Sequence, residues 1–166
     1  KELPKIVDDK RLDKGQQVIY IVDEFFKDKS IILRSLGVNH TDELLFISTK
    51  DEPTTEYINE LYLILLDRLD SRPAAIVGMG GGISMDVAKA ISNLLTNGGK
   101  AEDYQGWDLV KKPGIFKVAV PTLSGTGAEA TRTCVMTNKS SGLKLGMNSD
   151  FTVYDQIIMD PNLTKS

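Results

Sequence analysis

Two short stretches combine glycines and polar side chains in the pattern of an anion-binding site. The first, residues 78–86, contains Gly78 and the triplet Gly80, Gly81, Gly82, followed by Ser84 and Asp86. A glycine run lacks Cβ atoms, so its backbone N–H groups can approach an anion, and a helix that starts there adds its positive end. This stretch therefore predicts a phosphate site. The alternative is a turn that only lets a strand pack tightly on the following helix.

The second stretch, residues 120–131, carries four hydroxyl side chains and two glycines, and three of those hydroxyls belong to Thr122, Ser124 and Thr126. Such a loop is rich in hydrogen-bond donors. Ligands of open α/β sheets bind beyond the carboxyl ends of the strands, so both stretches are expected to flank one crevice and together hold a diphosphate. The alternative is a Ser/Thr-rich turn that caps a short helix at 125–130.

The glycines match neither of the two common phosphate-loop fingerprints. The dinucleotide fingerprint G-x-G-x-x-G/A would need glycine or alanine at position 83, where this chain has Ile83. That fingerprint also follows the first strand of its fold, whereas this stretch follows the third predicted strand. A P-loop needs Gly-Lys-Ser/Thr after the glycines, which is absent here. The prediction of a nucleotide site therefore rests on the joint occurrence of the two stretches.

Strands and helices alternate along the first 120 residues. Short apolar runs and helical spacing of apolar residues predict strands at 17–22, 44–48, 74–77 and 116–120, and helices at 24–36, 53–69 and 83–95. The polar segment 1–16 is expected to cover the first strand or to form a small edge element. Residues 100–114 are expected to form a surface crossover, and 131–137, 143–147 and 151–159 shorter strands. The pattern indicates an α/β fold, a Rossmann-like parallel sheet flanked by helices with a small β appendage.

Composition excludes several classes of function. The chain has 166 residues, 41% of them hydrophobic, and a net charge of −3, which argues against nucleic-acid and anionic-membrane partners. No apolar run approaches the roughly 20 residues that a membrane span needs. Cys134 is the single cysteine, so an internal disulfide is excluded and the cytoplasm is the expected location. His40 is the single histidine, expected in a solvated loop, and it cannot build a multi-histidine metal site.

Together the two stretches closely resemble the signature motifs of the iron-containing (group III) alcohol dehydrogenase family, which is related in fold to dehydroquinate synthase and glycerol dehydrogenase. Lys144 falls at the family's spacing after the second motif, and residues 157–163 look like the segment that ends its nucleotide domain. The resemblance covers nearly the whole chain. It implies that residues 1–166 form a dinucleotide-binding domain like the N-terminal domain of dehydroquinate synthase.

The resemblance also implies a role for each matched residue. The three glycines would hold the pyrophosphate with Ser84 nearby, Asp86 would lie on the nicotinamide side, the loop hydroxyls would donate to phosphates and the nicotinamide ribose, and Lys144 would bond that ribose. Asp23, at the end of the first strand, would hold the adenine-ribose hydroxyls, and its charge would favour NAD over NADP. One departure is Ile83, which stands where the family usually has serine. The cofactor-binding residues implied are Asp23, Gly80, Gly81, Gly82, Ser84, Asp86, Thr122, Ser124, Thr126 and Lys144.

In the resembled family an aspartate and three histidines of a helical C-terminal domain hold a divalent metal, iron or zinc. That domain would begin just after Leu163, so the 166 residues are expected to contain no metal ligand and no catalytic residue. The chain alone is accordingly expected to bind dinucleotide weakly or not at all and to be inactive, and the complete protein to form a homodimer. Dehydrogenation needs the metal to polarise the substrate oxygen while the nicotinamide accepts the hydride.

For the substrate, residues 102–108 and 131–137 look similar to the subgroup that oxidises the terminal hydroxyl of 3-deoxy-D-manno-octulosonate, a lipopolysaccharide sugar. Arg132 could pair with the sugar carboxylate, although an ordinary ion pair explains it equally well. Two alternatives for the whole chain stay open. One is the lobe of a dehydroquinate synthase-like lyase, which uses NAD without net redox change, and the other is a stand-alone nucleotide-binding module.

Overall fold

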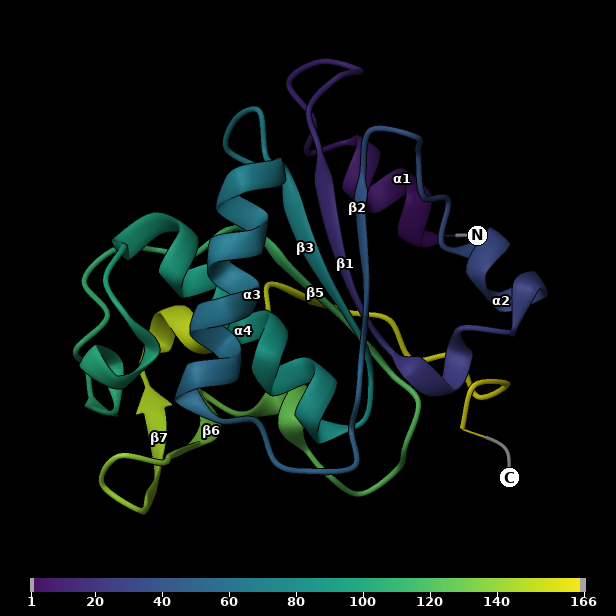
Figure 1. Ribbon diagram of the computed structural model, residues 1–166. Coiled ribbons are helices and arrows are strands. Elements are labelled where there is room, and N and C mark those ends of the chain that lie inside the picture. Colours follow the sequence, from purple (N-terminus) through teal and green to yellow (C-terminus); the bar gives the residue numbers. More distant parts are fainter. Residues whose placement is uncertain (1, 165–166) are drawn as a thin grey trace.

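A five-stranded parallel sheet forms the centre of the molecule (Figure 1). The computed structural model describes residues 2–164. The strand order is β2-β1-β3-β5-β8, and every pair of neighbouring strands is parallel. The strands span Val18–Asp23 (β1), Glu43–Ile47 (β2), Ala75–Gly80 (β3), Lys117–Pro121 (β5) and Gln156–Ile157 (β8).

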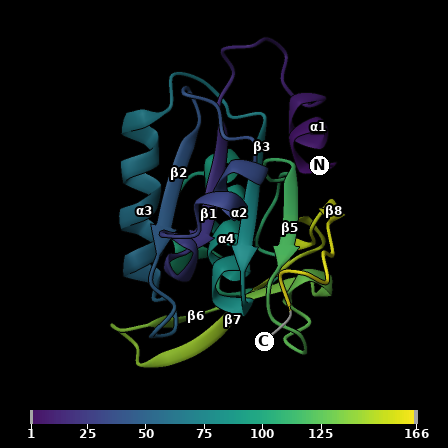
Figure 2. The same ribbon diagram turned by 90° about the vertical axis from the view of Figure 1, so that its right-hand side faces the viewer.

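Helices cover both faces of this sheet (Figure 2). On one face lie α3 (Thr55–Arg68) and α4 (Gly82–Asn97), and on the other lie α1 (Glu2–Asp8) and α2 (Ser30–Ser35). Strand β1 shows why: Ile19 and Ile21 pack toward α3 and α4, whereas the alternate residues, such as Tyr20, pack toward α1. A strand buried on both faces needs a continuous apolar run, as β1 has. The parallel sheet with helices on both faces confirms the predicted Rossmann-like α/β fold.

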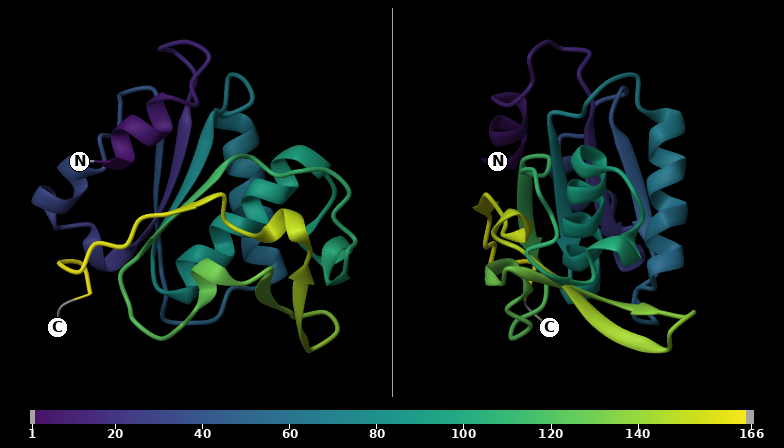
Figure 3. Two further views of the ribbon diagram at one scale, coloured as in Figure 1. Left: turned by 180° about the vertical axis from the view of Figure 1, so that it is seen from behind. Right: turned by 90° about the vertical axis from the view of Figure 1, so that its left-hand side faces the viewer.

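A smaller sheet lies at the carboxyl ends of the main strands, and it is the predicted β appendage. Strands β6 (Thr133–Asn138) and β7 (Leu143–Asn148) form an antiparallel hairpin, and β4 (Gly106–Trp107) pairs with β7. Figure 3 shows the hairpin projecting below the main sheet, while the C-terminal segment crosses the face that α1 covers. Short 3-10 helices occupy Glu24–Phe26, Ala101–Tyr104, Ala128–Ala130 and Asp150–Thr152.

The segment 24–36 is not the single helix that its apolar spacing predicted. A 3-10 turn follows β1 because the Asp23 carboxylate accepts the backbone N–H of Phe25, and the α-helix begins only at Ser30. Of the apolar residues that suggested one helix, Phe25 and Ile31 are largely exposed. Of the two arrangements predicted for 1–16, the structure shows the one that covers the first strand, because this segment begins with helix α1, which buries Leu3 and Val7 against the sheet.

Strand β3 runs three residues further than predicted. Gly78 and Gly80 are paired within the sheet, opposite Ala119 and Pro121 of β5, so the chain turns only at Gly81. The predicted strand at 151–159 was wrong over most of its length. The Ser149 hydroxyl accepts the N–H of Phe151 and starts a 3-10 turn there, leaving only two residues for β8.

Within residues 2–164, no helix combines the length and the apolar character that crossing a bilayer requires. Cys134 is completely buried in β6, and burial raises the pKa of its thiol. His40 is exposed in the loop before β2, as the sequence predicted.

Candidate functional site

The glycine turn stands at the carboxyl end of β3, in the middle of the sheet. Gly80 adopts a φ of +147°, a conformation that side-chain-bearing residues rarely occupy. A Cβ at Gly80 would overlap the Ser84 hydroxyl and would come within 3.0 Å of the Asp23 Cβ. Backbone geometry and space both require glycine here. The turn is therefore shaped by its neighbours on α4 and β1.

Helix α4 begins at this turn with unsatisfied donors. Its N-cap residue is Gly81, and among the described residues no side chain caps the N–H groups of its first turn. The Ser84 hydroxyl is buried and has no hydrogen-bond partner within residues 2–164. Uncapped N–H groups, the positive end of a 16-residue helix and an orphaned hydroxyl together fit a phosphate group.

The second stretch lies directly beside the first, which confirms that both loops share one edge of the sheet. The backbone N–H of Thr122 donates to the Gly80 carbonyl at 2.9 Å. A Cβ at Gly81 would lie 2.8 Å from Leu123 Cδ1, and one at Gly82 would lie 3.7 Å from Thr126 Cβ. The glycine backbone thus faces the hydroxyl-bearing loop across van der Waals distance.

Hydroxyls of this loop differ in exposure. Thr122 is buried, whereas Ser124 and Thr126 are exposed. Ser124 lines a cavity of about 320 Å³ together with Glu129 and Asp160. One Glu129 oxygen is buried there without a hydrogen-bond partner in the described chain. Ser124 and Thr126 are therefore free to meet a ligand, while Thr122 acts through its backbone.

Asp23 lies at the carboxyl end of β1, on the other side of Gly80. One carboxylate oxygen accepts the N–H of Phe25 at 3.0 Å, and the other accepts the Thr49 hydroxyl at 3.1 Å. These bonds fix the carboxylate between the ends of β1 and β2. The acidic group predicted for ribose recognition is thus placed beside the glycine turn.

Asp86 projects from α4, one turn after the glycines, and its carboxylate accepts the backbone N–H of Val135 at 3.0 Å. Burial raises its pKa from 3.8 to about 6, against the opposing effects of that hydrogen bond and of Lys89 and Lys144. The protein therefore holds this carboxylate where burial disfavours its charge, a condition frequent in functional sites.

Lys144 and Arg132 both form ion pairs at the surface. Lys144, on β7, pairs with Glu52. Arg132 pairs with Asp108, lies 3.3 Å from the Asp150 carboxylate, and stacks 6.0 Å from the Trp107 ring centre. The structure thus supports the ion-pair explanation for Arg132, whose charge already faces two carboxylates.

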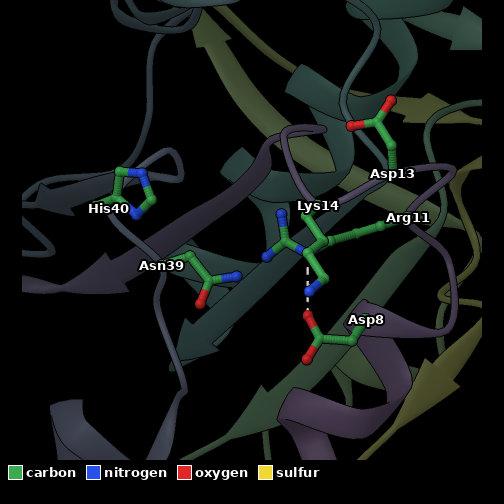
Figure 4. A pocket seen from close by; sticks show the side chains of 6 residues that line it. All are labelled: Asp8, Arg11, Asp13, Lys14, Asn39 and His40. Carbon is green, nitrogen blue, oxygen red and sulfur yellow. Dashed lines mark hydrogen bonds and ion pairs between the residues drawn. The ribbon is translucent and has the colours of Figure 1, made fainter.

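A larger cavity lies at the opposite edge of the sheet, before β1 and β2. It measures about 580 Å³ and is lined by Asp8, Arg11, Asp13, Lys14, Asn39 and His40 (Figure 4). The Arg11 guanidinium binds both Asp42 oxygens, at 2.7 and 2.8 Å, and also Asp8. These bonds join the loop before β1 to the loop before β2, so Arg11 has a structural role at this edge. The carboxyl edge of the sheet is therefore the candidate site.

Sequence reasoning overlooked one residue near the site, Lys89. It is completely buried on α4 and donates to oxygens at the end of the hydroxyl-bearing loop. The available signal was a lysine one turn after Asp86 on the apolar side of the helix.

Metal ligation does not fit the described residues. Among residues 2–164, no group of three or more His, Cys, Asp or Glu side chains could hold a metal ion. No chemical step through a metal follows from this part of the chain.

Comparison with known proteins supplies the family. The family model of iron-containing alcohol dehydrogenases matches residues 2–161. The chain belongs to this family. The sulfoacetaldehyde reductase of Bilophila wadsworthia is 40% identical over 89 residues, which is 54% of this chain and 23% of that protein. The NAD-dependent methanol dehydrogenase of Bacillus methanolicus matches with the same identity and coverage.

Solved structures of the family share the fold. The sulfoacetaldehyde reductase of Bifidobacterium kashiwanohense, determined in complex with NAD+, superposes with a TM-score of 0.80 and 25% identity, over 98% of this chain and 42% of that one. The chain therefore spans less than half of the solved relative and about a quarter of the curated ones. It matches the N-terminal part of iron-containing alcohol dehydrogenases, which are oxidoreductases.

Proposed function

We propose that residues 1–166 are the dinucleotide-binding lobe of a metal- and NAD-dependent alcohol dehydrogenase, which oxidises a primary or secondary hydroxyl by hydride transfer. One observation carries the proposal: the uncapped start of α4, with its orphaned Ser84 hydroxyl, faces the Thr122 loop at the carboxyl edge of the sheet. The NAD complex of a structural relative supports it.

The same geometry supports specific cofactor contacts. The glycine turn and Ser84 bind the diphosphate, and Ser124 and Thr126 donate from the opposite loop. Asp86 and Lys144 serve the nicotinamide side, and the Asp23 carboxylate holds the adenine-ribose hydroxyls. A fixed negative charge there repels a 2′-phosphate, so NAD is preferred over NADP.

In this proposal the lobe works with a helical C-terminal domain that supplies iron or zinc, in a cytoplasmic homodimer. When bound, the metal polarises the substrate oxygen.

The finer substrate assignment is a lipopolysaccharide sugar acid. It requires Arg132 to exchange Asp108 or Asp150 for the substrate carboxylate. If Arg132 takes that role, Arg132→Gln raises the KM for the sugar acid and leaves the KM for a neutral alcohol unchanged.

Binding and turnover test the proposal separately. NADH fluorescence titration of the complete protein measures the site itself, and a Ser124→Ala/Thr126→Val double variant should bind more weakly than the parent protein. Steady-state rates of the complete protein with NAD and NADP then test cofactor preference. Faster turnover with NADP would contradict the role of Asp23, and the absence of net NADH formation with any alcohol would contradict the dehydrogenase assignment.

A further inference from the structure

Lys89 is a completely buried lysine on the side of α4 that faces the hydroxyl-bearing loop. Its ammonium nitrogen lies 2.6 Å from the Ala128 carbonyl, 2.9 Å from the Thr131 carbonyl and 2.8 Å from the Thr133 carbonyl. The Thr131 hydroxyl lies at 3.1 Å. One side chain thus gathers three backbone carbonyls from the end of this loop and the start of β6.

Burying an ammonium group costs free energy, so other interactions must offset this cost. Burial of an ammonium group is unfavourable, and it lowers the pKa of Lys89 despite the nearby carboxylate of Asp86. The three carbonyls converge on one point, where the only other donor among the described residues is the Thr131 hydroxyl, at 3.4 Å from the Ala128 carbonyl and 3.3 Å from the Thr133 carbonyl. Without the ammonium group these carbonyls would lose their strongest donor. The ammonium group is the donor that lets the chain take this path.

The position of Lys89 on α4 links the two halves of the site. The helix begins at Gly82 in the glycine turn, and Lys89 follows roughly two turns later. Asp86, on the same helix, binds the N–H of Val135 in β6. A single rigid element thus holds the glycine turn at its first residues and the far end of the hydroxyl-bearing loop at Lys89.

We infer that Lys89 is a positioning residue that sets the distance between the hydroxyl-bearing loop and the glycine turn, and so sets affinity for the dinucleotide diphosphate. This inference rests on the proposed dinucleotide site. Lys89 does not contact the ligand. It acts through the loop carbonyls, so its loss should loosen residues 122–131 even in the ligand-free protein.

Two variants test this role, with a matched control. Lys89→Met keeps the length of the side chain and removes the donor. Thr131→Val keeps the ammonium group and removes the hydroxyl that accepts from it and donates to the Ala128 and Thr133 carbonyls. The control is Lys117→Met. Lys117 is also buried, but its ammonium group lies near the Ile115 carbonyl and Asp155, at the amino end of β5 and away from the loop.

We expect Lys89→Met to weaken NADH binding about tenfold or more, equivalent to about 1.4 kcal/mol, and Thr131→Val to weaken it by a smaller factor. In the ligand-free protein, hydrogen exchange of residues 122–131 should accelerate in both variants. Lys117→Met should change neither quantity, even if its unfolding free energy falls as much as that of Lys89→Met.

Each result decides the question. Unchanged exchange of residues 122–131 in Thr131→Val and in folded Lys89→Met overturns the positioning role, whether or not the protein binds NADH. Accelerated exchange with unchanged NADH affinity also overturns it, because the loop would then be loosened without consequence for the ligand. Should Lys89→Met fail to fold, Thr131→Val alone decides by the same two measurements. A complete parent protein that fails to bind NADH contradicts the proposed function, whereas the exchange comparison still tests the structural part.

Discussion

The backbone N–H of Thr122 donates to the carbonyl of Gly80 across the ends of β5 and β3, at 2.9 Å. This bond continues the sheet by one more rung, so the glycine turn and the hydroxyl-bearing loop leave the sheet side by side. The loops are thereby brought together by strand pairing, which explains why two stretches about 40 residues apart in sequence form one site.

Gly80→Ala should disrupt this junction. The methyl group would meet the Ser84 hydroxyl, and φ at this position is +147°. We expect the free energy of unfolding to fall by roughly 2–4 kcal/mol from overpacking and backbone strain, with loss of NADH binding. Gly142→Ala is the control, since Gly142 also has a positive φ, +71°, but open space around it in the β6–β7 turn. Equal losses in urea unfolding of both variants would contradict the proposed crowding at Gly80.

Asp23→Asn should relax the preference for NAD. The amide keeps the shape of the side chain and can still accept the N–H of Phe25, but it removes the charge that repels a 2′-phosphate in the proposed site. We expect the ratio of kcat/KM for NADP to that for NAD to rise about tenfold in the complete protein, the scale of one partly screened charge interaction. Thr49→Val is the companion variant, because it removes one bond to the carboxylate and keeps the charge. An unchanged ratio in Asp23→Asn would show that another group selects the cofactor.

Asp86 should make stability depend on pH. Its folded-state pKa of about 6 lies above the ordinary 3.8, so the folded state binds the proton more tightly than the unfolded state. The favourable contribution is complete below pH 3.8 and is lost as pH rises to about 6, for a total of up to about 3 kcal/mol.

Asp86→Asn removes this titration. We expect the variant to be more stable than the parent chain at pH 7, by up to about 3 kcal/mol, and nearly equal to it at pH 3.5. Urea unfolding of both chains across this pH range measures the difference. A gap that stays constant with pH would mean that the Asp86 carboxylate is not the titrating group. Its binding of NADH should fall even as its stability rises.

Two leucines of α3 test the packing of the helix layer. Leu65 is completely buried between α3 and the sheet, whereas Leu63, on the same helix, is 63% exposed. Leu65→Ala should lower the free energy of unfolding by about 2–5 kcal/mol through lost burial and an unfilled cavity, and Leu63→Ala by less than about 0.5 kcal/mol. Comparable losses from both substitutions would contradict the orientation of α3.

Local patterns in the sequence were sufficient for the fold class and for the prediction that the two loops leave one edge of the sheet. The apolar runs of β1, β3 and β5 predict buried parallel strands, because a strand covered on both faces has no polar side. The glycines and hydroxyls could likewise be identified directly, since donor-rich loops at strand ends have a characteristic composition. Sequence spacing also indicated helices α3 and α4, whose apolar stripes face the sheet.

Tertiary structure decided what depends on neighbours distant in sequence. Residues 24–36 do not form one continuous helix because the Asp23 carboxylate caps a 3-10 turn, and the spacing of apolar residues does not predict this cap. The partners of Arg132, Asp108 and Asp150, meet it only after β4, β6 and the 3-10 turn at 150–152 assemble. The role of Lys89 depends on backbone carbonyls about 40 residues away, which meet its ammonium group only in the folded chain. Backbone carbonyls occur at every residue, so their convergence on a buried ammonium group leaves no mark in the sequence.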